Sequence, residues 1–120
     1  MKRILAVDDS ASVRQMISFT LRKAGYEVGE AIDGLDGITK AAESKFDMII
    51  TDLNMPRMDG IQMIAALRTK SAYLFTPILM LTTESEPEKK EAGRKAGATG
   101  WIVKPFNVDQ LLAVMQKLVR

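Results

Sequence analysis

Short apolar runs and amphipathic stretches alternate five times along this 120-residue chain, and this alternation restricts its fold more than any other feature. Three of the runs are almost entirely apolar, as strands are when both faces of their sheet are covered. The runs expected to form strands are Arg3–Val7, Glu27–Ala31, Phe46–Thr51, Pro77–Thr82 and Gly100–Val103. The first, third and fourth are predicted to be central, and the second, which alternates polar with small residues, to be an edge. The pattern predicts a single α/β domain with a doubly wound parallel sheet.

The stretches between these runs carry the end signals of helices. Helices are predicted over residues 11–24, 34–44 and 60–70, from about 87 to 96, and from 107 onward. Asp33, Asp59 and Asn107 stand at N-cap positions, and a glutamine three residues after Asp59 completes the pattern of a capping box. Gly25 and Gly97 stand at the C′ positions that end two of the helices.

The composition excludes several classes of function. With 47% hydrophobic and 27% charged residues, the chain is typical of a globular domain, and its apolar runs are far too short to insert into a membrane. The run Ile4–Val7 is also too short for a signal peptide, so we expect a cytoplasmic protein. The net charge is 17 − 15 = +2, which does not indicate a nucleic-acid partner, and we expect a monomer.

The chain contains neither cysteine nor histidine. Disulfides, thiolate metal sites and cysteine nucleophiles are therefore excluded. A Ser-His-Asp triad and a histidine metal site are excluded as well. Any metal site must use oxygen ligands.

Five polar residues stand where predicted strands end: Asp8, Asp9, Asp52, Thr82 and Lys104. Because the carboxyl ends of parallel strands meet along one crevice, we expect these side chains to form one site. Three carboxylates within about 5 Å repel by about 3 kcal/mol per pair at an effective dielectric constant of about 20, so the site calls for a cation. Oxygen ligands beside open water favour Mg²⁺.

Each of these residues also has an ordinary structural explanation. The Asp8-Asp9-Ser10 segment could cap a helix, and Asp52 with residues 54–60 could form a turn. Thr82 could be a simple strand residue and Lys104 a solvated lysine. Because all four segments stand at the ends of predicted strands, a single shared site is the better explanation than four unrelated structural roles.

In order and spacing, these segments resemble the receiver domains of two-component response regulators. The matching segments are Val7-Asp8-Asp9-Ser10, Thr51-Asp52-Leu53-Asn54-Met55-Pro56, Asp59-Gly60, Leu81-Thr82-Thr83 and Lys104-Pro105-Phe106. The resemblance extends over residues 1–120 and includes no output domain, as in the single-domain chemotaxis regulators of that family. It implies a flavodoxin-like (βα)5 fold with the strand order 2-1-3-4-5.

The resemblance also implies a chemistry. Asp52 would be the phosphoacceptor, whose carboxylate attacks a phosphoryl group to form an aspartyl-phosphate. Mg²⁺ would be held by Asp9, Asp52 and the backbone carbonyl of Asn54, with Asp8 acting mainly through water. Such a protein is a signalling switch that does not turn over a small-molecule substrate.

Further residues take roles around the phosphoryl group by the same resemblance. Lys104 would neutralise its oxygens, Thr82 would donate its hydroxyl, and the backbone at Leu53 and Thr83 would contact it. The bond from Lys104 to Pro105 would be a cis peptide.

Phosphorylation in this family is relayed outward through a threonine and an aromatic residue, which here are Thr82 and Trp101. Tyrosine or phenylalanine is usual at the second position, so the larger indole leaves two interpretations open: Trp101 turns inward, or it is a fixed aromatic. Asn54 and Glu84, two positions beyond Asp52 and Thr82, would set the lifetime of the phosphorylated state.

The resemblance implies two partners. Since the chain has no histidine, the phosphodonor would be a separate histidine kinase or a small molecule such as acetyl phosphate. The output surface would be formed by the helix near 87–96, the strand 100–103 and the last helix, and its partner could be a flagellar motor switch protein. Trp101 would anchor this surface, and the residues around it are Lys89, Lys90, Arg94, Lys95, Val108, Gln116 and Lys117. A merely solvated helix face is the alternative.

Three other functions remain open. A stand-alone receiver could serve a phosphorelay outside chemotaxis. A haloacid-dehalogenase-like phosphatase also forms an aspartyl-phosphate, but it needs a second aspartate where this chain has Asn54. A binding module could keep the fold without being phosphorylated, although it would have no chemical need for Thr82 and Lys104.

Overall fold

Five parallel strands form one twisted sheet in the computed structural model, which describes residues 2–83 and 87–118. The strands are β1 (Arg3–Val7), β2 (Glu27–Ala31), β3 (Met48–Asp52), β4 (Ile78–Thr82) and β5 (Gly100–Val103). Their spatial order is β2-β1-β3-β4-β5, and all neighbours pair in parallel. The predicted α/β fold and strand order are confirmed, with β2 at an edge and β1, β3 and β4 in the interior.

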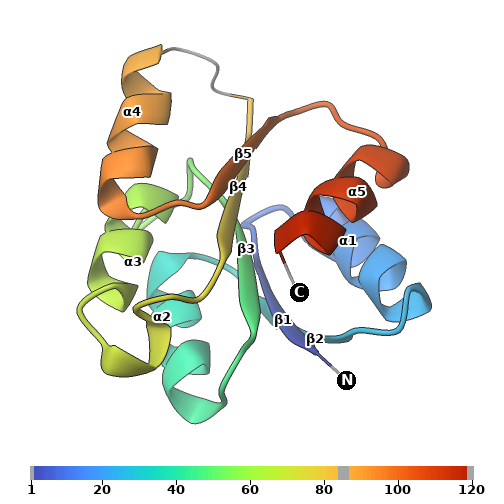
Figure 1. Ribbon diagram of the computed structural model, residues 1–120, viewed down its shortest axis with the longest axis horizontal. Helices are drawn as coiled ribbons and strands as arrows, with labels where there is room; N and C mark the ends of the chain where they lie inside the picture. Colours follow the sequence, from blue (N-terminus) through green and yellow to red (C-terminus); the bar gives the residue numbers. More distant parts are fainter. Residues whose placement is uncertain (1, 84–86, 119–120) are drawn as a thin grey trace.

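Helices cover both faces of this sheet (Figure 1). In chain order they are α1 (Ala11–Lys23), α2 (Gly34–Glu43), α3 (Gly60–Leu67), the short 3-10 helix η1 (Ser71–Tyr73), α4 (Pro87–Ala96) and α5 (Val108–Leu118). Figure 1 shows α2, α3 and α4 on one side of the sheet and α1 and α5 on the other. This is the three-layer arrangement of a doubly wound domain.

The core is divided by the sheet into two apolar clusters. Along β1, Leu5 and Val7 join the cluster beneath α2 and α3, whereas Ile4 and Ala6 join the cluster beneath α1 and α5. This division follows from the two-residue period of a strand. Because both faces are covered, every residue of β4 is buried. Burial of each large aliphatic side chain stabilises the fold by about 1.5–3 kcal/mol.

The predicted helix ends are formed by side-chain and glycine caps. A carboxylate oxygen of Asp33 accepts a hydrogen bond from the Asp36 amide at 2.9 Å. The side-chain oxygen of Asn107 accepts one from the Gln110 amide at 2.7 Å. Asp59 and Gln62 form the reciprocal capping box, with bonds of 2.8 and 3.0 Å. Two glycines adopt the left-handed backbone that follows a helix: Gly25 (φ 99°) and Gly97 (φ 116°).

Element bounds differ from the prediction at several ends. Strand β3 begins at Met48, because the Asp47 carboxylate accepts a hydrogen bond from the Arg3 amide at 2.9 Å and turns the chain there. Helix α3 ends at Leu67, and Arg68 donates to the carbonyls of Tyr73 and Gly97. The helix predicted over 60–70 is therefore shorter by about one turn. The large apolar side chains of Met16 on α1 (36%) and Val108 on α5 (43%) are exposed.

Candidate functional site

Three aspartates gather at the carboxyl ends of β1 and β3. Asp8 and Asp9 follow β1 directly, and Asp52 is the last residue of β3. Because Val7 is the register partner of Thr51, the next residues on the two strands lie side by side. One carboxylate oxygen from each aspartate lies within 4.8 Å of the others. Asp8 is buried, Asp52 is partly buried and Asp9 is exposed.

Lys104 brings a positive charge to this acidic cluster from the far end of the chain. Its Nζ lies 3.1 Å from Asp8 Oδ2 and 3.6 Å from Asp52 Oδ1. The backbone amide of Lys104 donates to the Thr82 carbonyl at 2.7 Å, which ties the end of β5 to the end of β4. The peptide bond between Lys104 and Pro105 is cis. The ammonium therefore balances one of three neighbouring negative charges.

The charge of Asp52 is disfavoured by its surroundings. Burial raises the pKa of the Asp52 carboxyl above its ordinary value of 3.8, and the neighbouring charges of Asp8 and Asp9 raise it further. The Lys104 ammonium and the Leu53 amide act in the opposite direction without reversing the shift. The negative charges at this site therefore outnumber the positive ones, which favours the binding of a cation.

The acidic segment after β1 serves both as a helix cap and as part of the site. Ser10 Oγ accepts a hydrogen bond from the Val13 amide at 3.3 Å and caps α1. Asp8 Oδ1 accepts from the Ser10 amide at 2.8 Å, while Oδ2 contacts Lys104. Arg14 on α1 donates to the Asp8 carbonyl at 2.7 Å, which fixes the backbone at this strand end. Ser10 therefore caps α1, whereas Asp8 belongs to the acidic site.

The donor set fits Mg²⁺. The ligand atoms that the three aspartates offer are all oxygens. Mg²⁺ selects such ligands and keeps several waters, and the exposed side of the cluster at Asp9 leaves room for them.

Other residues expected around the phosphoryl group lie at the same edge of the sheet. Thr82 is fully buried at the end of β4, and Thr83 follows it at the surface. The Leu53 amide donates to Asp52 Oδ1 at 2.9 Å, so this backbone donor faces the carboxylate. Asn54 is exposed. Glu84 lies outside the described residues.

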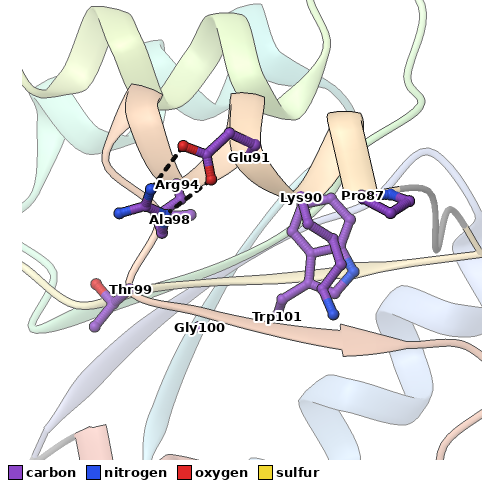
Figure 2. A pocket seen from close by; sticks show the side chains of 8 residues that line it. All are labelled: Pro87, Lys90, Glu91, Arg94, Ala98, Thr99, Gly100 and Trp101. Atoms are coloured by element: carbon purple, nitrogen blue, oxygen red, sulfur yellow. Dashed lines mark hydrogen bonds and ion pairs between the residues drawn. The ribbon is translucent and has the colours of Figure 1, made fainter.

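Trp101 on β5 is half-buried and packs against α4. A Cβ atom on Gly93 would lie 2.8 Å from the indole ring, so only glycine leaves room for the ring at this position. The indole N–H is enclosed and makes no hydrogen bond within the described part of the chain. Beside it lies a hollow of about 440 Å³. Figure 2 shows the indole toward one end of this hollow and the Arg94–Glu91 ion pair (2.6 Å) toward the other.

One ion pair near the site escaped sequence reasoning. Arg57 Nη2 lies 2.6 Å from Asp33 Oδ2, and Arg57 Nε donates to the same oxygen at 2.7 Å. The Asp36 amide hydrogen bond at this helix cap and the Arg57 guanidinium lower the pKa of the Asp33 carboxyl, although burial opposes them. The two residues are 24 positions apart, and nothing in the sequence around Arg57 distinguishes it from an ordinary turn residue.

The fold and site together define a doubly wound α/β domain with an acidic pocket and a lysine at the carboxyl edge of its sheet. Residues 4–116 match the response regulator receiver domain, and the chain belongs to this family. It is therefore a receiver domain of a two-component system. Members of the family are signalling switches that bind Mg²⁺ at an acidic pocket, and in this chain Asp8, Asp9 and Asp52 form an acidic cluster.

Three relatives illustrate the similarity. The chemotaxis protein CheY4 of Vibrio cholerae is 56% identical, with a TM-score of 0.95 over 98% of each chain. The receiver domain of sensor histidine kinase PA1611 from Pseudomonas aeruginosa, solved with a magnesium ion in its active site cleft, is 27% identical, with a TM-score of 0.91 over 98% of this chain and 97% of that one. The transcriptional regulator RpaA of Synechocystis is 36% identical over 120 residues, which are all of this chain and 50% of RpaA.

The chain thus spans about half the length of the curated relatives that it matches first. Among the described residues, no helix has both the length and the apolar character needed to span a membrane.

Proposed function

We propose that this receiver domain is a switch activated by phosphorylation of Asp52. The observation that carries the proposal is the juxtaposition at one strand edge: three aspartate oxygens within 4.8 Å, and the Lys104 ammonium 3.1 and 3.6 Å from two of them. Such an arrangement supplies a nucleophile together with fixed positive charge, which are the main requirements of phosphoryl transfer.

In the proposed reaction an Asp52 carboxylate oxygen attacks the phosphorus of a phosphohistidine on a separate kinase. A P–O bond to Asp52 forms as the P–N bond breaks, and the imidazole leaves with a proton from solvent. Asp9, Asp52 and the Asn54 carbonyl would hold the metal, with Asp8 acting through water. When bound, Mg²⁺ supplies positive charge against the phosphoryl oxygens.

The remaining site residues would position and report the phosphoryl group. Lys104, and the amides of Leu53 and Thr83, would contact its oxygens, and Thr82 would donate its hydroxyl to them. In the proposed relay the shift of Thr82 alters the position of Trp101. Asn54 and Glu84 would govern access of the hydrolytic water and hence the lifetime of the aspartyl-phosphate.

The output surface that we propose consists of α4, β5 and α5. The half-buried Trp101 at its centre is bordered by exposed basic side chains of α4, and the hollow beside the indole gives a partner a place to insert a side chain. The similarity to CheY4 favours chemotaxis and a flagellar motor switch protein as the partner. A cytoplasmic, monomeric receiver is consistent with this proposal.

Phosphorylation is tested by incubating the protein with acetyl phosphate and Mg²⁺ and measuring its intact mass. We expect the mass to increase by one phosphoryl group in the wild type and to stay unchanged in Asp52→Ala. Hydrolysis of added phosphate esters with turnover would instead favour the phosphatase. An unmodified wild type with every donor tried would favour the binding module.

The relay through Trp101 is tested with beryllofluoride, a stable mimic of the phosphoryl group. Trp101 is the only tryptophan, so its emission and its quenching by acrylamide report on one position. We expect both to change when the mimic and Mg²⁺ bind to the wild type, and neither to change in Asp52→Ala. An unchanged signal in a protein shown to bind the mimic would remove Trp101 from the switch.

A receiver in a phosphorelay outside chemotaxis is the second candidate, because this chain is 36% identical over 120 residues to RpaA, which is named a DNA-binding transcriptional regulator. A pull-down that compares beryllofluoride-treated with untreated protein distinguishes the two. Capture of a motor switch protein only by treated protein would support chemotaxis, and capture of another phosphorelay protein would support the alternative.

A further inference from the structure

The loop of residues 53–59 joins β3 to α3 and is held closely at both ends. The Gly60 amide donates to the Leu53 carbonyl at 2.9 Å, which closes the loop. Gly60 also has no space for a Cβ atom, because the Asp52 carbonyl oxygen occupies that position. The proposed phosphoacceptor and the loop with the Asn54 carbonyl therefore share one compact turn.

The middle of this loop has an unusual backbone. Arg57 has a φ angle of 67°, and it is the one non-glycine residue with positive φ in the described ranges 2–83 and 87–118. Left-handed backbone disfavours a residue with a side chain, so the surrounding contacts must hold Arg57 in this conformation. The Arg57 side chain makes the contact that could do so, since its guanidinium binds Asp33 through two nitrogens at 2.6 and 2.7 Å.

Asp33 is well placed to anchor the loop because it is itself immobilised. Its side chain is only 3% exposed, and its second oxygen accepts the Asp36 amide at 2.9 Å as the N-cap of α2. The next residue, Gly34, donates its amide to the Met58 carbonyl at 3.1 Å, and a Cβ atom there would collide with Met58. The loop is thus joined to the first turn of α2 by a side-chain pair and by a backbone hydrogen bond.

We propose that the Asp33–Arg57 ion pair positions the loop that carries the Asn54 carbonyl for Mg²⁺ binding. Neither residue touches the metal, so both are positioning residues. Metal affinity depends on such supporting contacts because they fix the ligands before binding. This role rests on the proposed magnesium site, and it adds a contact outside the aspartate cluster on which Mg²⁺ affinity depends.

The test uses the whole chain and measures the Mg²⁺ dissociation constant by isothermal titration calorimetry. Arg57→Gly removes the guanidinium while accepting the left-handed backbone, so the variant is expected to fold. Asp33→Asn removes the charge but keeps an oxygen that can cap α2. We expect each variant to bind Mg²⁺ about tenfold more weakly, at the lower end of the losses known for groups that support metal ligands.

The double variant Asp33→Asn/Arg57→Gly shows whether the two residues act through their shared contact or only through the stability of the fold. The double variant should bind Mg²⁺ no more weakly than either single variant, because both substitutions break the same contact. Arg57→Lys should restore part of the affinity. The matched control is Glu27→Ala, which breaks the Arg3–Glu27 ion pair (3.3 Å) at the amino-terminal ends of β1 and β2, opposite the carboxyl edge, and should leave the dissociation constant unchanged.

Two results would overturn the inference. If Arg57→Gly and Asp33→Asn bind Mg²⁺ within about twofold of the wild type, the ion pair only supports the fold, even where urea unfolding shows lower stability. If both variants lose affinity but their effects add in full, the residues act separately. A wild type that binds no Mg²⁺ would contradict the proposed metal site itself, which distinguishes that failure from a failure of the ion pair.

Discussion

At the scale of single residues, two partly or wholly buried aspartates have pKa values displaced in opposite directions. Burial raises the pKa of Asp52, whereas the Asp36 amide and Arg57 lower that of Asp33. Burial is the largest cause at Asp52, and its cation, Lys104, is shared with Asp8; within residues 2–83 and 87–118, the Arg57 guanidinium pairs with Asp33 alone. A displaced pKa links protonation to stability, and the direction decides the sign.

Asp52→Asn should therefore stabilise the protein at neutral pH. With a raised pKa, folded Asp52 binds its proton more tightly than unfolded Asp52, so its contribution to stability falls as pH rises through the interval above 3.8. The uncharged amide removes this cost. We expect the free energy of unfolding to increase by about 1 kcal/mol, the usual size of a single-residue effect, as measured by urea denaturation.

The same experiment at lower pH provides the check. The gain should shrink as pH falls and vanish below 3.8, where the Asp52 carboxyl is protonated in the folded and in the unfolded protein. Asp33→Asn should behave in the opposite way, because a lowered pKa contributes stability that is present above 3.8 and lost as pH falls below it. A gain for Asp52→Asn that does not vary with pH would show that repulsion at the site is not its cause.

At the scale of elements, the packing of α4 on β5 depends on one missing side chain. The Gly93 position on α4 faces the Trp101 ring, with Met80 of β4 also nearby. The indole, larger than the usual aromatic of this family, is accommodated because the helix has no Cβ atom there.

Gly93→Ala should displace the Trp101 ring. Alanine favours the helix over glycine by about 1 kcal/mol, but a Cβ atom 2.8 Å from a rigid ring costs about 1–3 kcal/mol. We expect a net loss of about 1 kcal/mol in unfolding free energy and a changed Trp101 emission spectrum in the unphosphorylated protein. Lys95→Ala, on an exposed position of the same helix, is the control and should change neither. Wild-type emission from Gly93→Ala would show that the ring does not rest on this glycine.

At the scale of the whole molecule, the site joins distant segments, so occupancy of the site should stabilise the entire fold. Asp8 follows β1, Asp52 ends β3 and Lys104 follows β5, and a ligand bound to the native state alone adds to the free energy of unfolding. For the aspartate cluster, the proposed ligand is Mg²⁺.

Addition of Mg²⁺ should accordingly raise the thermal midpoint. At a concentration of about ten times its dissociation constant, the gain is about 1.4 kcal/mol, which corresponds to about 5 °C for a domain of this size. Asp9→Asn is the informative variant, since removing the Asp9 charge relieves its repulsion of Asp52: the metal-free midpoint should not fall, while the shift on addition of Mg²⁺ should be smaller. Equal shifts in Asp9→Asn and the wild type would contradict a role for Asp9 in the site.

Structural features were predictable from the sequence where residues close together in the chain encode them. The strands, the caps at Asp33, Asp59 and Asn107, and the glycine ends were predictable because each is encoded by residues within one turn or one strand. The gathering of Asp8, Asp52 and Lys104 was predictable because parallel strands have only one carboxyl edge. The end of α3 was misplaced because the Thr69 and Lys70 amides bond to carbonyls only three residues back, which ends the α-helical hydrogen-bond pattern there.

The sequence by itself determined the class of fold, the order of the elements and the residues that meet at the carboxyl edge of the sheet. These depend on periodicity and spacing, which are properties of neighbouring residues. The tertiary structure alone decided the Asp33–Arg57 contact, the fit of Trp101 over Gly93 and the elevated pKa of Asp52. Those properties depend on angstrom-scale distances between segments far apart in the chain, and only the packed fold sets such distances.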